Sequence, residues 1–217
     1  MKYLKNKKFL VSIAFLLIGQ AFFYWFLKFF QPNPNYISFP LDEKIPFIPN
    51  FIYIYNTFYP FMFLTLLYLF KYDEKTYMKG IISGIIGFII CDIIYLYYPT
   101  IMLRPPIPET NALTNLVLRI TYFFDTPAVN CFPSIHCLFC FQIIFSYLKT
   151  KQISLKPKTL IIIYSLLIIL STILVKQHYV FDIIGALLVC LITNFIVDIL
   201  ETKTILTKFI NNKKLTS

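Results

Sequence analysis

The stretch STILVKQHYVFDIIGALLVCLITNFIVDIL at residues 171–200 decides the fold class of this chain. From His178 onward it is an almost unbroken apolar run. It is long enough for an α-helix to cross the hydrocarbon layer of a membrane, which is about 30 Å thick. His178 and Asp182 stand four positions apart at its start and therefore share one face of a helix. Ionisable side chains at the end of a membrane helix predict a functional site at the membrane surface.

The composition extends this interpretation to the whole chain. Hydrophobic residues make up 58% and aromatic residues 19% of the sequence, well above the usual content of a soluble domain. We therefore expect an all-α, polytopic membrane protein formed by a single domain, residues 1–217. Residues 99–133 are expected to form a long outer loop, and residues 134–200 core helices that carry polar motifs. Six transmembrane helices are expected, at residues 9–27, 51–70, 78–98, 134–147, 159–175 and 178–200.

Three glycines in the third segment have the spacing that favours close helix packing in lipid. Gly80 and Gly84 form a GxxxG pattern, and Gly87 follows about one turn later. We expect this stripe to face a neighbouring helix, and we assign it no chemical role.

The net charge of +10 follows the loops of the chain. Alternation of strongly and weakly basic loops is the pattern of membrane topology, so we expect no nucleic-acid partner. With both termini in the cytoplasm, 15 of the 20 basic residues fall on the inner side of the cytoplasmic (plasma) membrane. These inner residues are Lys2, Lys5, Lys7, Lys8, Lys71, Lys75, Lys79, Lys149, Lys151, Lys156, Lys158, Lys203, Lys208, Lys213 and Lys214. The outer side keeps Lys28, Lys44, Arg104, Arg119 and Lys176.

Basic residues kept on the outer side are candidates for function. Arg104 lies in LRPPIP at residues 103–108, whose prolines cannot continue a helix. Residues 113–124 are then expected to lie as a short amphipathic helix on the membrane surface. Lys176 stands two residues before His178. The expected topology brings all of these residues to the outer ends of helices, where a shared site is geometrically allowed.

The sequence FPSIH at residues 132–136 supplies the second of only two histidines. Ser134 is expected to cap the next helix and His136 to lie in its first turn, beside free backbone N–H groups that favour anions such as phosphate. Asp182 is expected to hold one ring nitrogen of His178 and to orient the other. The two histidines predict proton transfer or nucleophilic chemistry. For either one alone, a hydrogen bond to a neighbouring helix is an equally good interpretation.

These motifs resemble the three signatures of the type-2 phosphatidic acid phosphatase superfamily. The resemblance rests on the RP pair at residues 104–105, PSIH at 133–136 and HYVFD at 178–182, which occur in the family's order. It implies a membrane protein that carries out metal-independent phosphoryl transfer without a cofactor.

The resemblance also implies a role for each site residue. His178 would be the nucleophile that forms a phosphohistidine, Asp182 would orient it, and His136 would protonate the leaving alkoxide. Arg104 and Ser134 would bind phosphate oxygens, although a simple helix cap is an alternative role for Ser134, and an anchor at the lipid head groups is one for Arg104.

Two positions depart from the family's pattern. The first motif usually begins with a lysine, where this chain has Tyr97, and the third usually reads Ser-Arg, where this chain has Ser171 and Thr172. We expect Lys176 to supply one of the missing cations as a substrate-binding residue, and Arg119 or a backbone amide the other. An anchor at the lipid head groups is the alternative role for both Lys176 and Arg119. FPSIH and STILVKQHYVFD also resemble the inositol phosphorylceramide synthase and sphingomyelin synthase branch, whose members transfer phosphorylated head groups between lipids.

These observations favour a membrane lipid phosphatase that hydrolyses a lipid phosphomonoester or diphosphate at the outer face of the membrane. The alternatives are a head-group phosphotransferase and, outside the enzymes, a lipid-binding or transport protein. The expected partners are a lipid phosphate substrate and the bilayer. The sequence leaves open the head group and chain of the substrate and the oligomeric state.

The remaining candidates for reactive side chains are the cysteines and one intramembrane carboxylate. Cys137 and Cys140 lie close to His136, but no four-ligand zinc set can be named, so we interpret them as small apolar residues and expect no metal. Asp92 lies inside the third segment, where a carboxylate is costly and usually has a partner. Both a structural and a pathway-related role are open for it.

Overall fold

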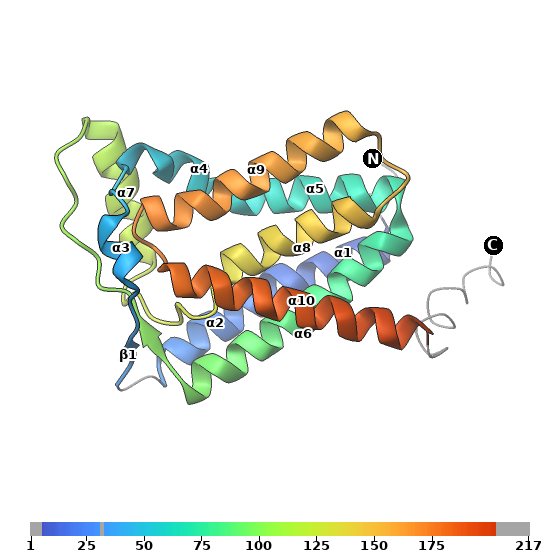
Figure 1. Ribbon diagram of the computed structural model, residues 1–217, viewed down its shortest axis with the longest axis horizontal. Helices are drawn as coiled ribbons and strands as arrows, with labels where there is room; N and C mark the ends of the chain where they lie inside the picture. Colours follow the sequence, from blue (N-terminus) through green and yellow to red (C-terminus); the bar gives the residue numbers. More distant parts are fainter. Residues whose placement is uncertain (1–5, 31–32, 203–217) are drawn as a thin grey trace.

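A computed structural model describes residues 6–30 and 33–202 of the chain, so Lys2, Lys5 and the lysines beyond residue 202 lie outside the described residues. A bundle of long helices dominates the described part (Figure 1). The bundle comprises α1 (Lys7–Ala14), the π-helical turn η2 (Phe15–Gly19), α2 (Gln20–Lys28), α5 (Phe58–Tyr72), α6 (Glu74–Tyr97), α8 (Ile135–Lys149), α9 (Leu155–Leu174) and α10 (Val180–Thr202). Shorter elements lie mainly toward one end: β1 (Asn35–Tyr36), α3 (Pro40–Lys44), the 3-10 helix η3 (Pro49–Phe51), α4 (Ile52–Asn56), β2 (Thr100–Ile101) and α7 (Ala112–Phe124).

Helices occupy all six segments that the sequence assigns to the membrane, but six spans are not confirmed. In the part of the chain that the structure describes, four helical stretches are long and apolar enough to cross a membrane. The helix α8 has 15 residues and is therefore only about 22 Å long. The first segment is divided between α1 and α2 by η2. The four long stretches are Pro49–Tyr72, Glu74–Tyr97, Leu155–Leu174 and Val180–Glu201.

The short helix α8 lies at the centre of the bundle. It packs against α5, α6, α9 and α10, and its residues Leu138, Cys140 and Tyr147 are fully buried. Because neighbouring helices rather than lipid surround its backbone, it does not need the length of a lipid-facing helix.

The glycine stripe of α6 faces α8, as its spacing predicts. A Cβ atom on Gly80 would lie 2.7 Å from Ser146 Oγ, and one on Gly84 would lie 3.1 Å from the Phe139 ring. Gly87 meets the same helix. The absence of side chains on this face lets the two backbones approach closely.

Polar contacts join the loops at one end of the bundle, which we call the basic end. Asp73 lies between α5 and α6, caps α6 by accepting the Thr76 N–H at 3.0 Å, and accepts the Thr150 hydroxyl at 2.6 Å. Burial acts to raise the pKa of Asp73, but the hydrogen bonds from Thr150 and Thr76 outweigh it, so this pKa is lowered. Lys149 binds Asp198 of α10 at 2.8 Å. Lysines assigned to one side of the membrane thus share one end of the structure.

The opposite end, which we call the loop end, holds the shorter elements. There β1 pairs in parallel with β2, which joins the segment after α2 to the segment after α6. The amphipathic helix expected at residues 113–124 is present as α7. Its residues Leu116, Ile120 and Phe123 are exposed, whereas Thr114 and Leu118 are fully buried. An apolar stripe is therefore left open on a helix that is too short to span a membrane.

Candidate active site

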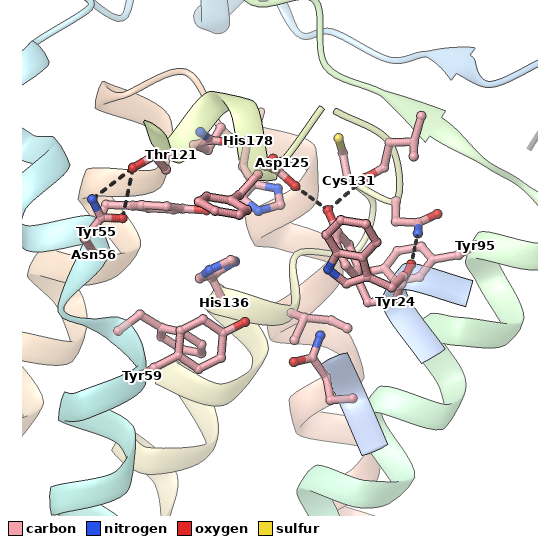
Figure 2. Close-up of a pocket in the computed structure, with 18 of the residues that line it drawn as sticks. Tyr24, Tyr55, Asn56, Tyr59, Tyr95, Thr121, Asp125, Cys131, His136 and His178 are labelled. Carbon is pink, nitrogen blue, oxygen red and sulfur yellow. Dashed lines mark hydrogen bonds between the residues drawn. The ribbon is translucent and has the colours of Figure 1, made fainter. Parts of the chain in front are cut away.

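A cavity of about 470 Å³ lies at the loop end, where the starts of α8 and α10 meet α2, α4 and α7. Both histidines, His136 and His178, line it (Figure 2). The chain therefore brings together two motifs that stand more than 40 residues apart in the sequence. Other lining residues include Tyr24, Tyr55, Phe58, Tyr59, Asp125 and Gln177.

His178 is held by a buried carboxylate. It stands just before α10, and its Nδ1 lies 3.1 Å from Asp182 Oδ2. The same oxygen accepts the backbone N–H of Tyr179 at 2.9 Å, which fixes the carboxylate. Because Nδ1 faces Asp182, Nε2 is the ring nitrogen left for a reactant in the cavity.

The backbone around His178 is fixed by two acceptors from other segments. Asp42 of α3 accepts the Val180 N–H at 2.8 Å, at the start of α10. The carbonyl of Thr172, near the end of α9, accepts the N–H groups of Gln177 and His178 at 2.9 and 3.2 Å. These bonds satisfy donors that the start of a helix otherwise leaves unpaired. They also set the position from which the imidazole projects.

His136 lies in the first turn of α8, as expected. Ser134 caps this helix, since its Oγ accepts the Cys137 N–H at 3.2 Å. The Ser134 N–H donates to the carbonyl of Asp182 at 3.1 Å, which ties the two motifs together. As a result, the ring centroids of His136 and His178 lie 5.9 Å apart. A single phosphate group in the cavity can contact both rings.

Aromatic side chains from α4 and α5 form a wall beside His136. The ring centroids of Phe58, Tyr55 and Tyr59 lie 4.5, 4.9 and 6.3 Å from that of His136. This wall shields the imidazole from bulk water on one side.

Arg104 is bonded to two residues that line the cavity. Its guanidinium donates to the carboxylate of Asp125 and to the side-chain oxygen of Gln177. It also lies over the ring of Tyr122, with Cζ 4.4 Å from the centroid. Only 10% of the Arg104 side chain is exposed. The guanidinium is thus a buried cation held against the cavity wall.

A second cation reaches the same carboxylate from α2. Lys28 Nζ lies 3.4 Å from Asp125 Oδ1, and 6% of its side chain is exposed. Tyr24, one turn earlier, donates its hydroxyl to the same oxygen at 2.6 Å. Asp125 therefore accepts from both Arg104 and Lys28.

Some of the expected phosphate ligands are placed elsewhere. Neither Ser134 nor Lys176 is among the described residues that line the cavity. Ser134 is fully buried as the helix cap, and Lys176 Nζ donates to the carbonyls of Asp42 and Ile45 at 3.2 and 2.6 Å. Arg119 is exposed on α7. None of these three side chains lines the cavity in the described part of the chain.

The side chains at the two positions that depart from the family's pattern, Tyr97 and Thr172, are not among the described residues that line the cavity. Tyr97 is 81% exposed at the end of α6. Thr172 is fully buried, and its hydroxyl donates to the carbonyl of Ile169 at 2.7 Å. Asp92 lies away from the histidines, beside an apolar pocket between α2 and α6, and its buried Oδ1 has no hydrogen-bond partner among the described residues.

Burial shifts the pKa of several groups near the site in the direction that favours their uncharged form. It raises the pKa of Tyr122 to about 12, with Arg104 acting in the opposite direction. It also raises the pKa of the Cys131 thiol, an effect that nearby carboxylates strengthen. Burial lowers the pKa of Lys176. A thiol with a raised pKa is a poor nucleophile, so we expect no nucleophilic role for Cys131.

The ionic groups of the site suit an anion. Within residues 6–30 and 33–202, no group of three or more His, Cys, Asp and Glu side chains gathers as a metal site would require. The cavity instead combines two imidazoles with guanidinium and ammonium groups behind one carboxylate. Such groups recognise phosphate oxygens.

The sequence left four contributors unassigned: Asp125, Gln177, Lys28 and Asp42. A role for Lys28 could have been predicted, because it is one of few basic residues on the outer side. Asp125 directly follows the segment expected as an amphipathic helix, which would have been a reason to examine it. No sequence pattern predicted a role for Gln177 or Asp42, because neither residue type is unusual in a loop.

Comparison with protein families agrees with this geometry. A family model described as the PAP2 superfamily matches residues 40–196, a range that contains Arg104, both histidines and Asp182. The chain belongs to the PAP2 superfamily. PAP2 membership and the long apolar helices make it a mostly helical, multi-pass membrane protein related to phosphatases and phosphotransferases. The resemblance to the inositol phosphorylceramide synthase branch is not confirmed, and neither curated proteins nor solved structures gave a match.

Proposed function

We propose that this PAP2 protein hydrolyses a lipid phosphomonoester or diphosphate through a phosphohistidine on His178. The observation that carries the proposal is the meeting of His136 and His178 in one cavity, with Asp182 bonded to Nδ1 of His178. A nucleophile, an orienting carboxylate and a proton donor are the groups that such a reaction needs.

The reaction proceeds in two steps. His178 Nε2 attacks phosphorus, the new P–N bond forms, and the bond from phosphorus to the leaving oxygen breaks as His136 gives that oxygen its proton. His136, now neutral, then takes a proton from water, whose oxygen attacks phosphorus. The P–N bond breaks, inorganic phosphate leaves, and both imidazoles return to their starting state.

The surroundings of the cavity suit a substrate that stays in the membrane. The exposed apolar stripe of α7 and the apolar surface of the bundle lie beside it. A lipid can therefore keep its chains in the bilayer and present only its phosphate to the histidines. We place the cavity at the outer face of the cytoplasmic membrane, with both termini inside, because basic residues gather at the opposite end. In this arrangement α8 and the helical run from α1 to α2 complete six passes.

The decisive experiment measures phosphate release by the purified full-length protein in detergent. Phosphatidic acid, lysophosphatidic acid and a polyprenyl diphosphate are supplied with a chelator present. We expect the wild type to release phosphate and His178→Ala to release none. Equal release by the two proteins would overturn the proposal.

A trapping experiment tests the intermediate directly. A substrate labelled on its phosphate should leave an acid-labile, base-stable label on the wild-type protein, as expected for phosphohistidine. His178→Ala should take up no label. A label that persists in this variant would place the covalent bond elsewhere.

Head-group transfer is the second candidate function. A cavity of about 470 Å³ with aromatic walls can hold an acceptor alcohol as well as the phosphate. The absence of cations at Tyr97 and Thr172 also suits a phosphodiester, which carries less charge than a phosphomonoester. Addition of an alcohol or ceramide acceptor separates the candidates, because a transferase would form a new phospholipid at the expense of free phosphate. A lipid-binding or transport protein would bind the lipid and yield neither product.

A further inference from the structure

The carboxylate of Asp125 connects two cations at the wall of the cavity. We propose that Lys28 and Arg104 form the phosphate-binding pair of this site, and that the Asp125 carboxylate occupies their place until a substrate phosphate displaces it. This proposal rests on the proposed function. It adds Lys28 and Asp125, which both lie outside the three signature motifs.

The bonding pattern of Asp125 resembles that of a bound phosphate. Oδ2 accepts from Arg104, while Oδ1 accepts from the Tyr24 hydroxyl and lies 3.4 Å from Lys28 Nζ. Both cations are almost fully buried, and a buried cation needs an anion beside it. In the absence of substrate, Asp125 supplies that anion.

The arrangement of the wall requires the carboxylate to move. Asp125 lines the cavity, whereas Arg104 and Lys28 are not among the described residues that do. A phosphate next to the histidines therefore meets the carboxylate first. Rotation about the side-chain torsions of Asp125 removes it from between the phosphate and the two cations.

Unused donors near the histidines also point to a missing anion. Gln177 is 2% exposed and lines the cavity, but its Nε2 has no hydrogen-bond partner among the described residues. Arg104 Nε is likewise buried and without a partner there. A buried donor without an acceptor is costly. Phosphate oxygens would satisfy both donors and the two cations together.

This assignment accounts for the lysine that the first signature motif lacks. Tyr97 stands in its place and is largely exposed, while Lys176 is bonded to the carbonyls of Asp42 and Ile45. Lys28 of α2 is the lysine that shares an anion with Arg104. The second cation of the site is thus supplied by a helix that precedes the whole family-matched range.

The test measures the binding of inorganic phosphate to the full-length protein in detergent, both from the shift in thermal unfolding and from inhibition of lipid phosphate hydrolysis. Asp125→Asn removes the competing charge and should tighten phosphate binding about tenfold. Lys28→Gln should weaken it about tenfold, in the wild type and in the Asp125→Asn background alike. Lys28→Arg keeps the charge and should bind as the wild type does.

Matched controls come from exposed residues of the same end. Glu109→Gln removes one negative charge from the long loop at residues 99–133, and Lys44→Gln removes one positive charge. Neither substitution should change phosphate binding. Gel filtration and the unfolding temperature without phosphate verify that each variant is folded.

Each outcome decides the proposal. Weaker or unchanged phosphate binding by Asp125→Asn would mean that this carboxylate only orients Arg104, and would overturn it. So would a Lys28→Gln variant that behaves like Lys44→Gln. If hydrolysis depends on His178 but the Asp125→Asn and Lys28→Gln variants bind phosphate as the wild type does, the proposed cation pair is wrong and the proposed function stands. If His178→Ala is fully active, the proposed function fails, and the phosphate titration still reports on Lys28 and Asp125.

Discussion

The two walls of the cavity are built in different ways. The histidine wall consists of His136, His178 and Asp182, which all lie in the first turns of α8 and α10 or directly before them. The cation wall consists of Asp125 at the end of α7, which lines the cavity, and of Arg104 from a loop and Lys28 from α2, which lie behind this carboxylate. In the proposed mechanism the reactive groups thus come from short motifs on two adjacent helices, whereas the binding groups come from distant segments. The comparison predicts that substitutions on the histidine wall reduce the rate of the chemical step, and that those on the cation wall change affinity.

The largest effect is expected for Asp182→Asn. An amide cannot hold His178 in the same tautomer as a carboxylate, and an equivalent change in another His–Asp pair lowers kcat about 10⁴-fold. We expect a loss of that order in kcat, with little change in KM. Asp198→Asn makes the same substitution at the basic end of the same helix and should leave kcat unchanged. If the Asp182→Asn protein keeps the kcat of the wild type, Asp182 does not orient His178 for the reaction.

His136→Gln should lower kcat about 10²- to 10⁴-fold, the usual contribution of a general acid. The reason is the poor leaving group: a lipid alkoxide needs a proton, whereas a nitrophenolate does not. A nitrophenyl phosphate ester should therefore recover most of the lost rate of the first step in single-turnover measurements. An equal loss with both substrates would show that His136 has another role.

Arg104→Lys tests the cation wall. A lysine keeps the charge but cannot bond Asp125 and Gln177 with one planar group, so KM should rise about tenfold while kcat changes less. Arg119→Lys, on the exposed side of α7, is the control and should behave as the wild type. A fall in kcat alone would assign Arg104 to the chemical step and weaken the contrast between the walls.

Gly185→Ala tests how closely the two histidine motifs must approach. A Cβ atom there would lie 2.5 Å from the ring of Phe132, which precedes Pro133 in the FPSIH motif. The ring must shift, and overpacking of this kind costs about 1–3 kcal/mol of stability. We expect a lower unfolding temperature and a several-fold loss of kcat, about 3- to 10-fold, from displacement of His136. Gly19→Ala meets nothing within 4 Å and should change neither quantity.

The smallest effect on catalysis is expected for Asp73→Ala, far from both walls. Loss of this helix cap should cost about 0.5–2 kcal/mol of stability without a change in kcat. Because folding lowers the pKa of Asp73 below its ordinary value of 3.8, its charged form stabilises the protein at neutral pH. The contribution disappears as the pH falls through the folded pKa. The difference in unfolding temperature between wild type and variant should therefore shrink below about pH 4. A difference that is independent of pH would show that the charge of Asp73 is not involved.

The sequence by itself determined the helical segments, their approximate ends and the short motifs that carry both histidines and Asp182. Apolar runs of membrane length and motifs within one helical turn are local patterns, and local geometry fixes which side chains share a face. Tertiary structure alone decided which charged groups gather beside the cavity. It placed the Lys176 ammonium on the carbonyls of Asp42 and Ile45 and the Ser134 hydroxyl at the cap of α8, and it brought Lys28 and Asp125 together across 97 positions of the chain. Such contacts depend on how helices far apart in the sequence pack, which spacing along the chain does not encode.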